Sequence, residues 1–239
     1  MGKRSSEAEI LAISRDGKEK KRDEVIHEET VVVRIDGEVH EFHCLPTNLE
    51  EMILGNLKSR GIDASSSTIT KTADNEFKVD LSYLERLTKN PERCDSNKRL
   101  TRKEVFASVE MLGENSFLFK KTGCAHVIGI CGDEREIFVE DTSRHCAIDK
   151  AIGLAIRNGI DLSNGYLVAS CRQTVSTIKK VIFCGIPIVI SIAAPTSLAV
   201  KEADEHGITL IGFASSKRFN IYSHAWRIKR FTMRSRTIG

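Results

Sequence analysis

The sequence predicts an α/β protein with a three-layer α/β/α core, preceded by a smaller N-terminal portion that contains β-strands. Two observations support this fold class. In the second half of the chain, short strands rich in Ile and Val alternate with helices of about ten residues, which is typical of a sheet covered on both faces. The hydrophobic share is 41% over 239 residues, which is enough for a core of that size and excludes a disordered chain.

The N-terminal part is expected to contain a lead-in, a hairpin and a helix. Residues 1–28 mix basic and acidic side chains without an apolar period, so we predict a flexible lead-in. Two β-rich runs, 30–35 and 38–44, flank Asp36-Gly37, which is a strong hairpin signal. A capping box at Thr47 then opens a helix.

A polar segment from Asn90 to Leu100 separates this part from the core and predicts an exposed loop. A second capping box, from Thr101 to Glu104, opens the helix that follows it. We therefore assign residues 29–115 to an N-terminal α+β portion. Residues 116–239 are assigned to the core with a basic C-terminal tail.

The core is expected to run in the order β-β-α-β-α-β-α-β-β. Ser or Thr before the helices and Gly after them mark their ends. In such sheets, ligands bind at the carboxyl ends of the strands, where helix N-termini converge. The predicted elements cover residues 125–131, 136–139, 144–158, 166–171, 174–184, 187–193, 197–206, 208–213 and 219–222.

Charge and cysteine usage narrow the class of protein. Residues 206–239 contain no Asp or Glu but seven Lys or Arg, so the partner of this end is expected to be an anion. The seven cysteines include no Cys-x-x-Cys pair, which favours free thiols in a reducing compartment. Because the chain has no signal peptide and no apolar run near the roughly 20 residues of a membrane span, we expect a cytoplasmic protein without a membrane partner.

Donor-rich turns follow three predicted strands. Arg144 and His145 stand at the start of a helix, where free backbone N–H groups and the helix dipole favour an anion. Arg172 lies in the second such turn, and Thr196 and Ser197 lie in the third. Helix capping is the simpler interpretation of each turn, but it does not account for an adjacent Arg-His pair. Together the three turns predict a phosphate-sized pocket.

The order of elements, with His at one helix start and Cys at the next, resembles the cytidine deaminase fold. Zinc deaminases need His-x-Glu in the first position and Pro-Cys-x-x-Cys in the second. Here His145 is followed by Cys146 and Ala147, and Cys171 has no second thiol after it. We therefore expect the deaminase-like fold without zinc and without deaminase chemistry.

Five motifs occur in order from Thr122 onward: TGCAH (122–126), EDTSRHCAIDKAIG (140–153), SNGYLVASCR (163–172), GIPIVISIAAPTSLAV (185–200) and GITLIGFASSKRFNIYSH (207–224). Together they resemble the formate dehydrogenase accessory sulfurtransferases (FdhD). The resemblance implies a cytoplasmic homodimer that takes persulfide sulfur from a cysteine desulfurase. It further implies transfer of this sulfur to the molybdenum (or tungsten) bis-pterin guanine dinucleotide cofactor of formate dehydrogenase, which is bound as cargo.

The chain departs from this family at its reactive cysteines. The usual Cys-Gly-x-Cys-Gly pair is absent, and only Cys94 lies in the comparable loop. The cations at 93, 98 and 99 favour a thiolate there, so Cys94 is the candidate persulfide carrier. An incidental surface cysteine is the alternative, with Cys124 and Cys131 as reserve candidates. The departure also leaves open a cofactor chaperone that moves no sulfur.

The resemblance places further cofactor contacts in a loop after the last parallel strand, and His126 comes from the first motif. Two cations and two hydroxyls beside a Phe suit a pyrophosphate. RNA binding by the basic, aromatic tail is a more distant alternative, because its aromatics alternate as core residues would. The loop residues are Phe213, Ala214, Ser215, Ser216, Lys217 and Arg218.

Overall fold

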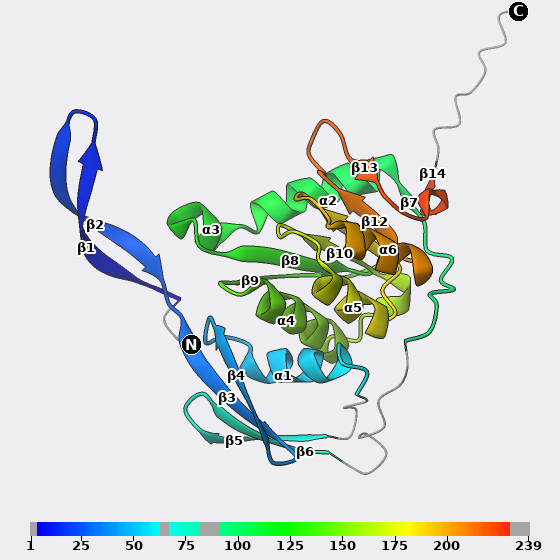
Figure 1. Ribbon diagram of the computed structural model, residues 1–239, viewed down its shortest axis with the longest axis horizontal. Coiled ribbons are helices and arrows are strands. Elements are labelled where there is room, and N and C mark those ends of the chain that lie inside the picture. The colour runs from blue at the N-terminus through cyan, green and yellow to red at the C-terminus, as the bar shows by residue number, and fades with distance from the viewer. Residues whose placement is uncertain (1–3, 63–66, 82–90, 230–239) are drawn as a thin grey trace, which may run out of the picture.

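The computed structural model describes residues 4–62, 67–81 and 91–229, and the α/β fold predicted from the sequence is confirmed (Figure 1). Its centre is a six-stranded sheet in the order β13-β12-β11-β10-β8-β9. The strands β10, β11 and β12 are parallel, and the other neighbours pair antiparallel. The strands are β8 (His126–Cys131), β9 (Glu136–Asp141), β10 (Tyr166–Ala169), β11 (Ile188–Ser191), β12 (Thr209–Gly212) and β13 (Asn220–Ile221).

Helices cover both faces of this sheet (Figure 1). The helices α4 (Arg144–Arg157), α5 (Val175–Phe183) and α6 (Ser197–Glu205) lie on one face, and α2 (Arg102–Glu114) lies on the other. Side chains alternate between the faces along each strand, as Leu167 and Val168 show: Leu167 packs with α4 and α5, and Val168 with α2.

A second, four-stranded sheet in the order β4-β3-β6-β5 packs on α1 (Leu49–Lys58), and α1 in turn packs on α4. The predicted hairpin at Asp36-Gly37 is confirmed, and both residues have positive φ. The predicted cap at Thr47 is wrong, because Asn48, in a left-handed conformation, precedes the helix instead. The strands are β3 (Glu29–Ile35), β4 (Glu38–Cys44), β5 (Thr68–Ala73) and β6 (Glu76–Asp80).

The expected flexible lead-in at residues 1–28 differs from the structure. Strands β1 (Ser5–Ser14) and β2 (Gly17–Ile26) form an antiparallel hairpin that projects from the body (Figure 1). The mixed charges that suggested mobility pair across this hairpin, as Arg22 does with Glu7 at 3.1 Å. Beside it, α3 (Phe117–Thr122) contacts β2.

The boundary expected near residue 115 also differs. Val105 and Leu112 of α2 pack on the six-stranded sheet, so this helix belongs physically with the core. The capping box at Thr101 is confirmed. Just before it, β7 (Leu100–Thr101) pairs in parallel with β14 (Ile228–Lys229), so residues near both ends of the core lie side by side.

The described ranges also contain two single-turn 3₁₀ helices, at Leu162–Asn164 and Ala225–Arg227. Among the helices of the described residues, none is both long enough and apolar enough to cross a membrane.

Candidate functional site

Four turns meet at the end of the sheet where β10, β11 and β12 have their carboxyl ends, and we call this the carboxyl edge. The turns cover residues 142–145, 170–174, 192–197 and 213–218. Backbone hydrogen bonds join three of them: Gln173 N donates to Ala194 O at 3.2 Å, and Phe213 N donates to Ala193 O at 3.2 Å. The twelve residues predicted to bind cofactor lie in these turns or, for His126, at the adjacent start of β8.

The positive charge at this edge comes from arginines. Burial lowers the pKa of His126, and the nearby Arg144 and Arg172 lower it further against the opposing effect of Asp141. Burial also lowers the pKa of His145, again with help from Arg144. Both imidazoles are therefore neutral at pH 7, where they offer hydrogen bonds, and the arginines carry the charge.

Two buried polar atoms near this edge have no hydrogen-bond partner in the described part of the chain. They are Nε of Arg144 and Oε1 of Gln173. Buried polar atoms are nearly always hydrogen-bonded, so each such exception calls for an explanation. An anionic or polar ligand at the edge would supply the partner that Arg144 lacks.

Exposed apolar side chains accompany these donors. Ile192, Leu198 and Phe213 are all exposed, and Phe213 has a left-handed φ of 50°. The backbone bond from Phe213 to Ala193 holds it next to the preceding turn. The edge therefore combines cations with an apolar surface on which a planar ring can lie.

Two of the predicted hydroxyl groups already form hydrogen bonds within the protein, and that of Ser215 donates to Arg218 O at 3.1 Å. The hydroxyl of Thr196 caps α6 by accepting from Ala199 N at 3.3 Å. The hydroxyl of Ser215 accepts from the backbone N–H of Lys217 and of Arg218. Lys217 and Arg218 also line a cavity of about 420 Å³ on the α2 side of the sheet. This loop is thus directed partly toward α2 and partly toward the other turns.

Cys94 lies at the opposite end of the same helices. Its N–H donates to the carbonyl of His206, which caps the C-terminus of α6, at 2.9 Å. Its Sγ lies 4.0 Å from the carbonyl oxygen of Gly185, just past α5. Since the nine residues of α6 span about 13 Å, the structure does not bring Cys94 together with Thr196 or the carboxyl edge.

Residues 91–99, which we call the strap, run along this end of the core without regular secondary structure. The expected exposed loop is confirmed in part: five of these nine residues are exposed, but Cys94 is half-buried and held from both sides. Arg227 donates to the carbonyl oxygens of Cys94 and Ser96, at 3.3 and 3.0 Å. The absence of acidic residues from 206–239 is the sequence signal that points to Arg227. This signal does not indicate that Arg227 binds the strap.

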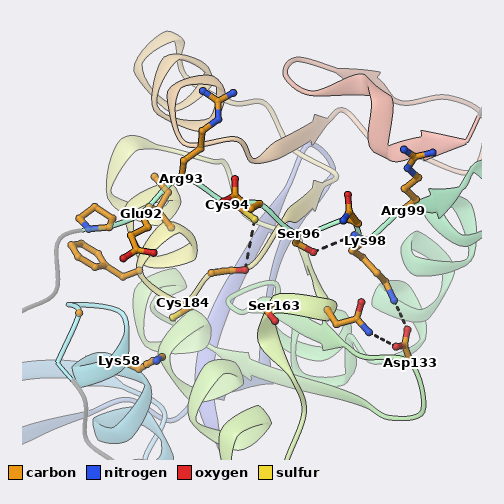
Figure 2. A pocket seen from close by; sticks show the side chains of 18 of the residues that line it. Lys58, Glu92, Arg93, Cys94, Ser96, Lys98, Arg99, Asp133, Ser163 and Cys184 are labelled. Atoms are coloured by element: carbon orange, nitrogen blue, oxygen red, sulfur yellow. Dashed lines mark hydrogen bonds and ion pairs between the residues drawn. The ribbon is translucent and has the colours of Figure 1, made fainter.

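A groove of about 1030 Å³ runs between the strap and the ends of α1 and α5 (Figure 2). Cys94 and Cys184 both line it. The cations expected to surround the thiol lie elsewhere: Lys98 binds Asp133, while Arg93 and Arg99 extend away from Cys94 (Figure 2).

Burial separates the seven cysteines, all of which the structure describes. Cys124 is exposed, Cys94 is half-buried, and the other five are buried. Burial raises the pKa of Cys131 to about 11 and that of Cys184 to about 12, so neither forms a thiolate readily. Cys94 and Cys124 are the two thiols that a partner can reach.

The aromatic residues of the tail serve largely in packing. Phe219 packs against Phe106 with ring centroids 5.3 Å apart, and the ring of Trp226 lies against Arg227 and Arg99. Tyr222 is partly exposed beside β12. Phe231, the remaining aromatic residue of the tail in the RNA-binding alternative, lies outside the described residues.

The fold and these two sites define an α/β protein with a cationic edge at one end of its helices and an accessible thiol at the other. Residues 78–229 match the model of the FdhD/NarQ family. The chain belongs to this family, as the sequence motifs predicted.

Relatives and a solved structure agree with this assignment. The chain is 32% identical over 228 residues to the sulfur carrier protein FdhD of Methanothermobacter thermautotrophicus, covering 86% of this chain and 92% of that one. It is 37% identical over 210 residues to the protein of that name from Sulfurisphaera tokodaii, covering 77% and 81%. A crystal structure from Desulfotalea psychrophila, provisionally described as a formate dehydrogenase accessory protein, matches with a TM-score of 0.83 at 25% identity, covering 95% of this chain and 100% of that one.

Proposed function

We propose that this protein is a sulfur carrier that accepts persulfide sulfur on Cys94 for the maturation of a formate dehydrogenase. The observation that carries the proposal is the position of Cys94 in a groove of about 1030 Å³, in a chain whose relatives are named sulfur carriers. Five of the other cysteines are buried. The groove is large enough to admit a cysteine-bearing loop of a donor protein.

The sulfur donor would be a cysteine desulfurase that carries a persulfide on its own cysteine. The Cys94 thiolate attacks the outer sulfur of that persulfide, a new S–S bond forms on Cys94, and the donor's S–S bond breaks. The donor cysteine leaves as a thiolate, so no external oxidant or reductant is needed.

The substrate that receives the sulfur would be the molybdenum or tungsten bis-pterin guanine dinucleotide cofactor, held at the carboxyl edge. Arg144 and Arg172 suit its phosphate groups, because charge-assisted hydrogen bonds to phosphate are strong. Phe213 and its exposed apolar neighbours suit the planar pterin or guanine rings. The unpaired Nε of Arg144 supports this use of the edge.

The distance between the two sites limits how the sulfur moves. Cys94 lies about one helix length from the carboxyl edge, so the sulfur cannot pass directly from it to a cofactor held there. Delivery would require the strap to leave its contacts with Arg227 and His206. The same separation favours the second candidate function, a cofactor chaperone that moves no sulfur.

Replacement of the nucleophile separates these two functions. We expect Cys94→Ser to take up no persulfide when incubated with a cysteine desulfurase and cysteine, measured by mass spectrometry of the intact protein. Cells that carry only this variant should lose formate dehydrogenase activity. Cys124→Ser, which removes the exposed thiol, is the matched control and should retain both properties. Full formate dehydrogenase activity with Cys94→Ser would exclude sulfur transfer through Cys94, and would leave transfer through Cys124 or the chaperone.

A second prediction concerns the carboxyl edge, with GDP as a probe for the nucleotide part of the cofactor. We expect Arg144→Gln to raise the Kd for GDP by about tenfold to a hundredfold, the range for loss of a charge-assisted hydrogen bond. Isothermal titration calorimetry would measure it. Lys201→Gln is the control, because Lys201 is exposed on α6 and pairs with Glu205. Equal affinities in wild type and Arg144→Gln would contradict this location of the nucleotide.

A further inference from the structure

Arg227 is a buried cation at the centre of the strap contacts. Its exposed fraction is 1%, and its guanidinium lies 4.2 Å from the centroid of the Trp226 ring. Nη1 donates to Gly207 O at 2.6 Å, and Nη2 donates to Ser96 O at 3.0 Å and Cys94 O at 3.3 Å. The same Nη2 lies 3.9 Å from the sulfur of Cys94.

The oxygen partners of this guanidinium are neutral. Within the described ranges, its hydrogen bonds go to carbonyl oxygens and to the hydroxyl of Thr209, and no ion pair joins it to a carboxylate. Buried charges are ordinarily paired, because removing a charge from water is costly. Burial lowers the pKa of Arg227, and a negative charge on Cys94 opposes that shift. The group that can carry the missing negative charge is therefore the sulfur of Cys94.

The other groups around the thiol do not replace Arg227. The C-terminal ends of α5 and α6, which face Cys94 through Gly185 and His206, carry the negative end of the helix dipole and disfavour a thiolate. His206 pairs with Glu202 at 3.8 Å. In the strap Arg93 extends away from the thiol (Figure 2), while Glu92 and Asp95 add negative charge to the groove, and Lys58 of α1 lines its far side.

We propose that Arg227 is the counter-charge of Cys94. Its guanidinium stabilises the Cys94 thiolate that attacks the donor persulfide, and then the persulfide anion that the attack leaves on Cys94. Its hydrogen bonds to the strap carbonyls fix the sulfur beside this charge. The persulfide part of this inference rests on the proposed function, whereas the thiolate part concerns the resting protein alone.

The wild-type protein provides the first test, because Cys124 serves as an internal reference. The rates at which iodoacetamide alkylates Cys94 and Cys124 are measured between pH 5 and about 10 by mass spectrometry of the two peptides. The midpoint of each profile reports thiolate formation, and the plateau at high pH reports access to the thiol. We expect the midpoint of Cys94 to lie about one pH unit or more below that of Cys124, although Cys94 is the less exposed thiol. A midpoint of Cys94 equal to or above that of Cys124 would overturn the proposal.

Variants of Arg227 then separate charge from structure. Arg227→Gln should raise the Cys94 midpoint by about one unit, which lowers the alkylation rate at neutral pH about tenfold. Arg227→Lys retains the charge and should keep most of the rate. Arg99→Gln is the matched control, because it removes the other arginine that contacts Trp226. If Arg227→Gln also released the strap, access to the thiol and hence the plateau would change, but the midpoint would not return to its wild-type value. An unchanged midpoint in Arg227→Gln would therefore refute a counter-charge. If Arg227→Gln does not fold, the wild-type profile and Arg227→Lys decide.

The two proposals fail in different ways. If Cys94 takes up persulfide but the midpoint of its alkylation profile does not change when Arg227 is replaced, the sulfur-carrier function stands and the counter-charge is wrong. If Arg227→Gln shifts the midpoint but Cys94 never takes up persulfide, the counter-charge of the thiolate stands and the sulfur-carrier function is wrong.

Discussion

Lys150→Met is expected to lower the free energy of unfolding by about 3–5 kcal/mol, the range for removing one partner of a buried ion pair. Lys150 and Asp141 are both fully buried, with Nζ 2.5 Å from Oδ2 of the carboxylate. Nζ also donates to Leu45 O at 2.6 Å, which ties the segment after β4 to the core. Without the lysine, Asp141 keeps a buried charge with no cation to neutralise it.

Chemical denaturation followed by circular dichroism would measure this loss. Lys78→Met is the control, because Lys78 and Asp80 form an exposed pair at 2.9 Å, and exposed pairs contribute roughly 0–1 kcal/mol. The double variant Asp141→Leu/Lys150→Met should recover part of the stability, since it leaves no charge unpaired. A loss in Lys150→Met no larger than in Lys78→Met would show that the buried pair contributes little.

The loss should also depend on pH. Burial raises the pKa of Asp141 above its ordinary value, and removal of Lys150 takes away the main opposing charge. A carboxyl group whose folded-state pKa is raised favours folding below its unfolded pKa and loses that contribution as the pH rises through the folded value. The deficit of Lys150→Met should therefore shrink as the pH falls from 7 toward 4.

Gly153→Ala is the second large effect, and we expect it to cost about 3 kcal/mol, at the upper end for overpacking. A Cβ on Gly153 would overlap the carbonyl of Glu51, and one on Gly55 would overlap that of Asp149, so α1 and α4 cross in backbone contact. Backbone atoms cannot turn aside as side chains do. The helices must separate instead, which disturbs the bonds of buried Asp149 to α1, including that from Asn56 at 2.9 Å.

Gly113→Ala in α2 is the matched control with the opposite sign. Nothing lies within 4 Å of a Cβ at Gly113, and an alanine in a helix is favoured over glycine by about 0.5–1 kcal/mol. Urea denaturation of the two variants should move the midpoint down for Gly153→Ala and up for Gly113→Ala. A stability of Gly153→Ala equal to that of wild type would mean that the two helices can separate without cost.

The core could be predicted closely because its signals are local. The helix from Arg144 ends before Gly159, and the helix from Ser197 follows the cap residue Thr196, as their caps and glycines indicate. The twelve candidate binding residues gather at one edge because parallel strands place their carboxyl ends together. The roles of these residues remain predictions.

What could not be predicted depends on contacts far apart in the sequence. Arg227 and Cys94 are 133 positions apart in the sequence. Sequence analysis therefore assigned stabilisation of the thiolate to the cations next to Cys94 in the chain instead. The hairpin at β1 and β2 has the composition of a disordered segment, and it is ordered by the pairing of its two strands and by the contact of β2 with α3. The contact between Gly55 and the backbone of α4 has no sequence signal beyond the glycine itself.

The helices α5 and α6 each have one end at the carboxyl edge and the other at the strap. If sulfur enters at Cys94 and leaves at the carboxyl edge, the donor and the recipient do not compete for one surface. The donor and the recipient can then be bound at the same time, and one need not leave before the other binds. The throughput of such a relay would depend on how often the strap detaches, rather than on how quickly one partner dissociates to admit the next.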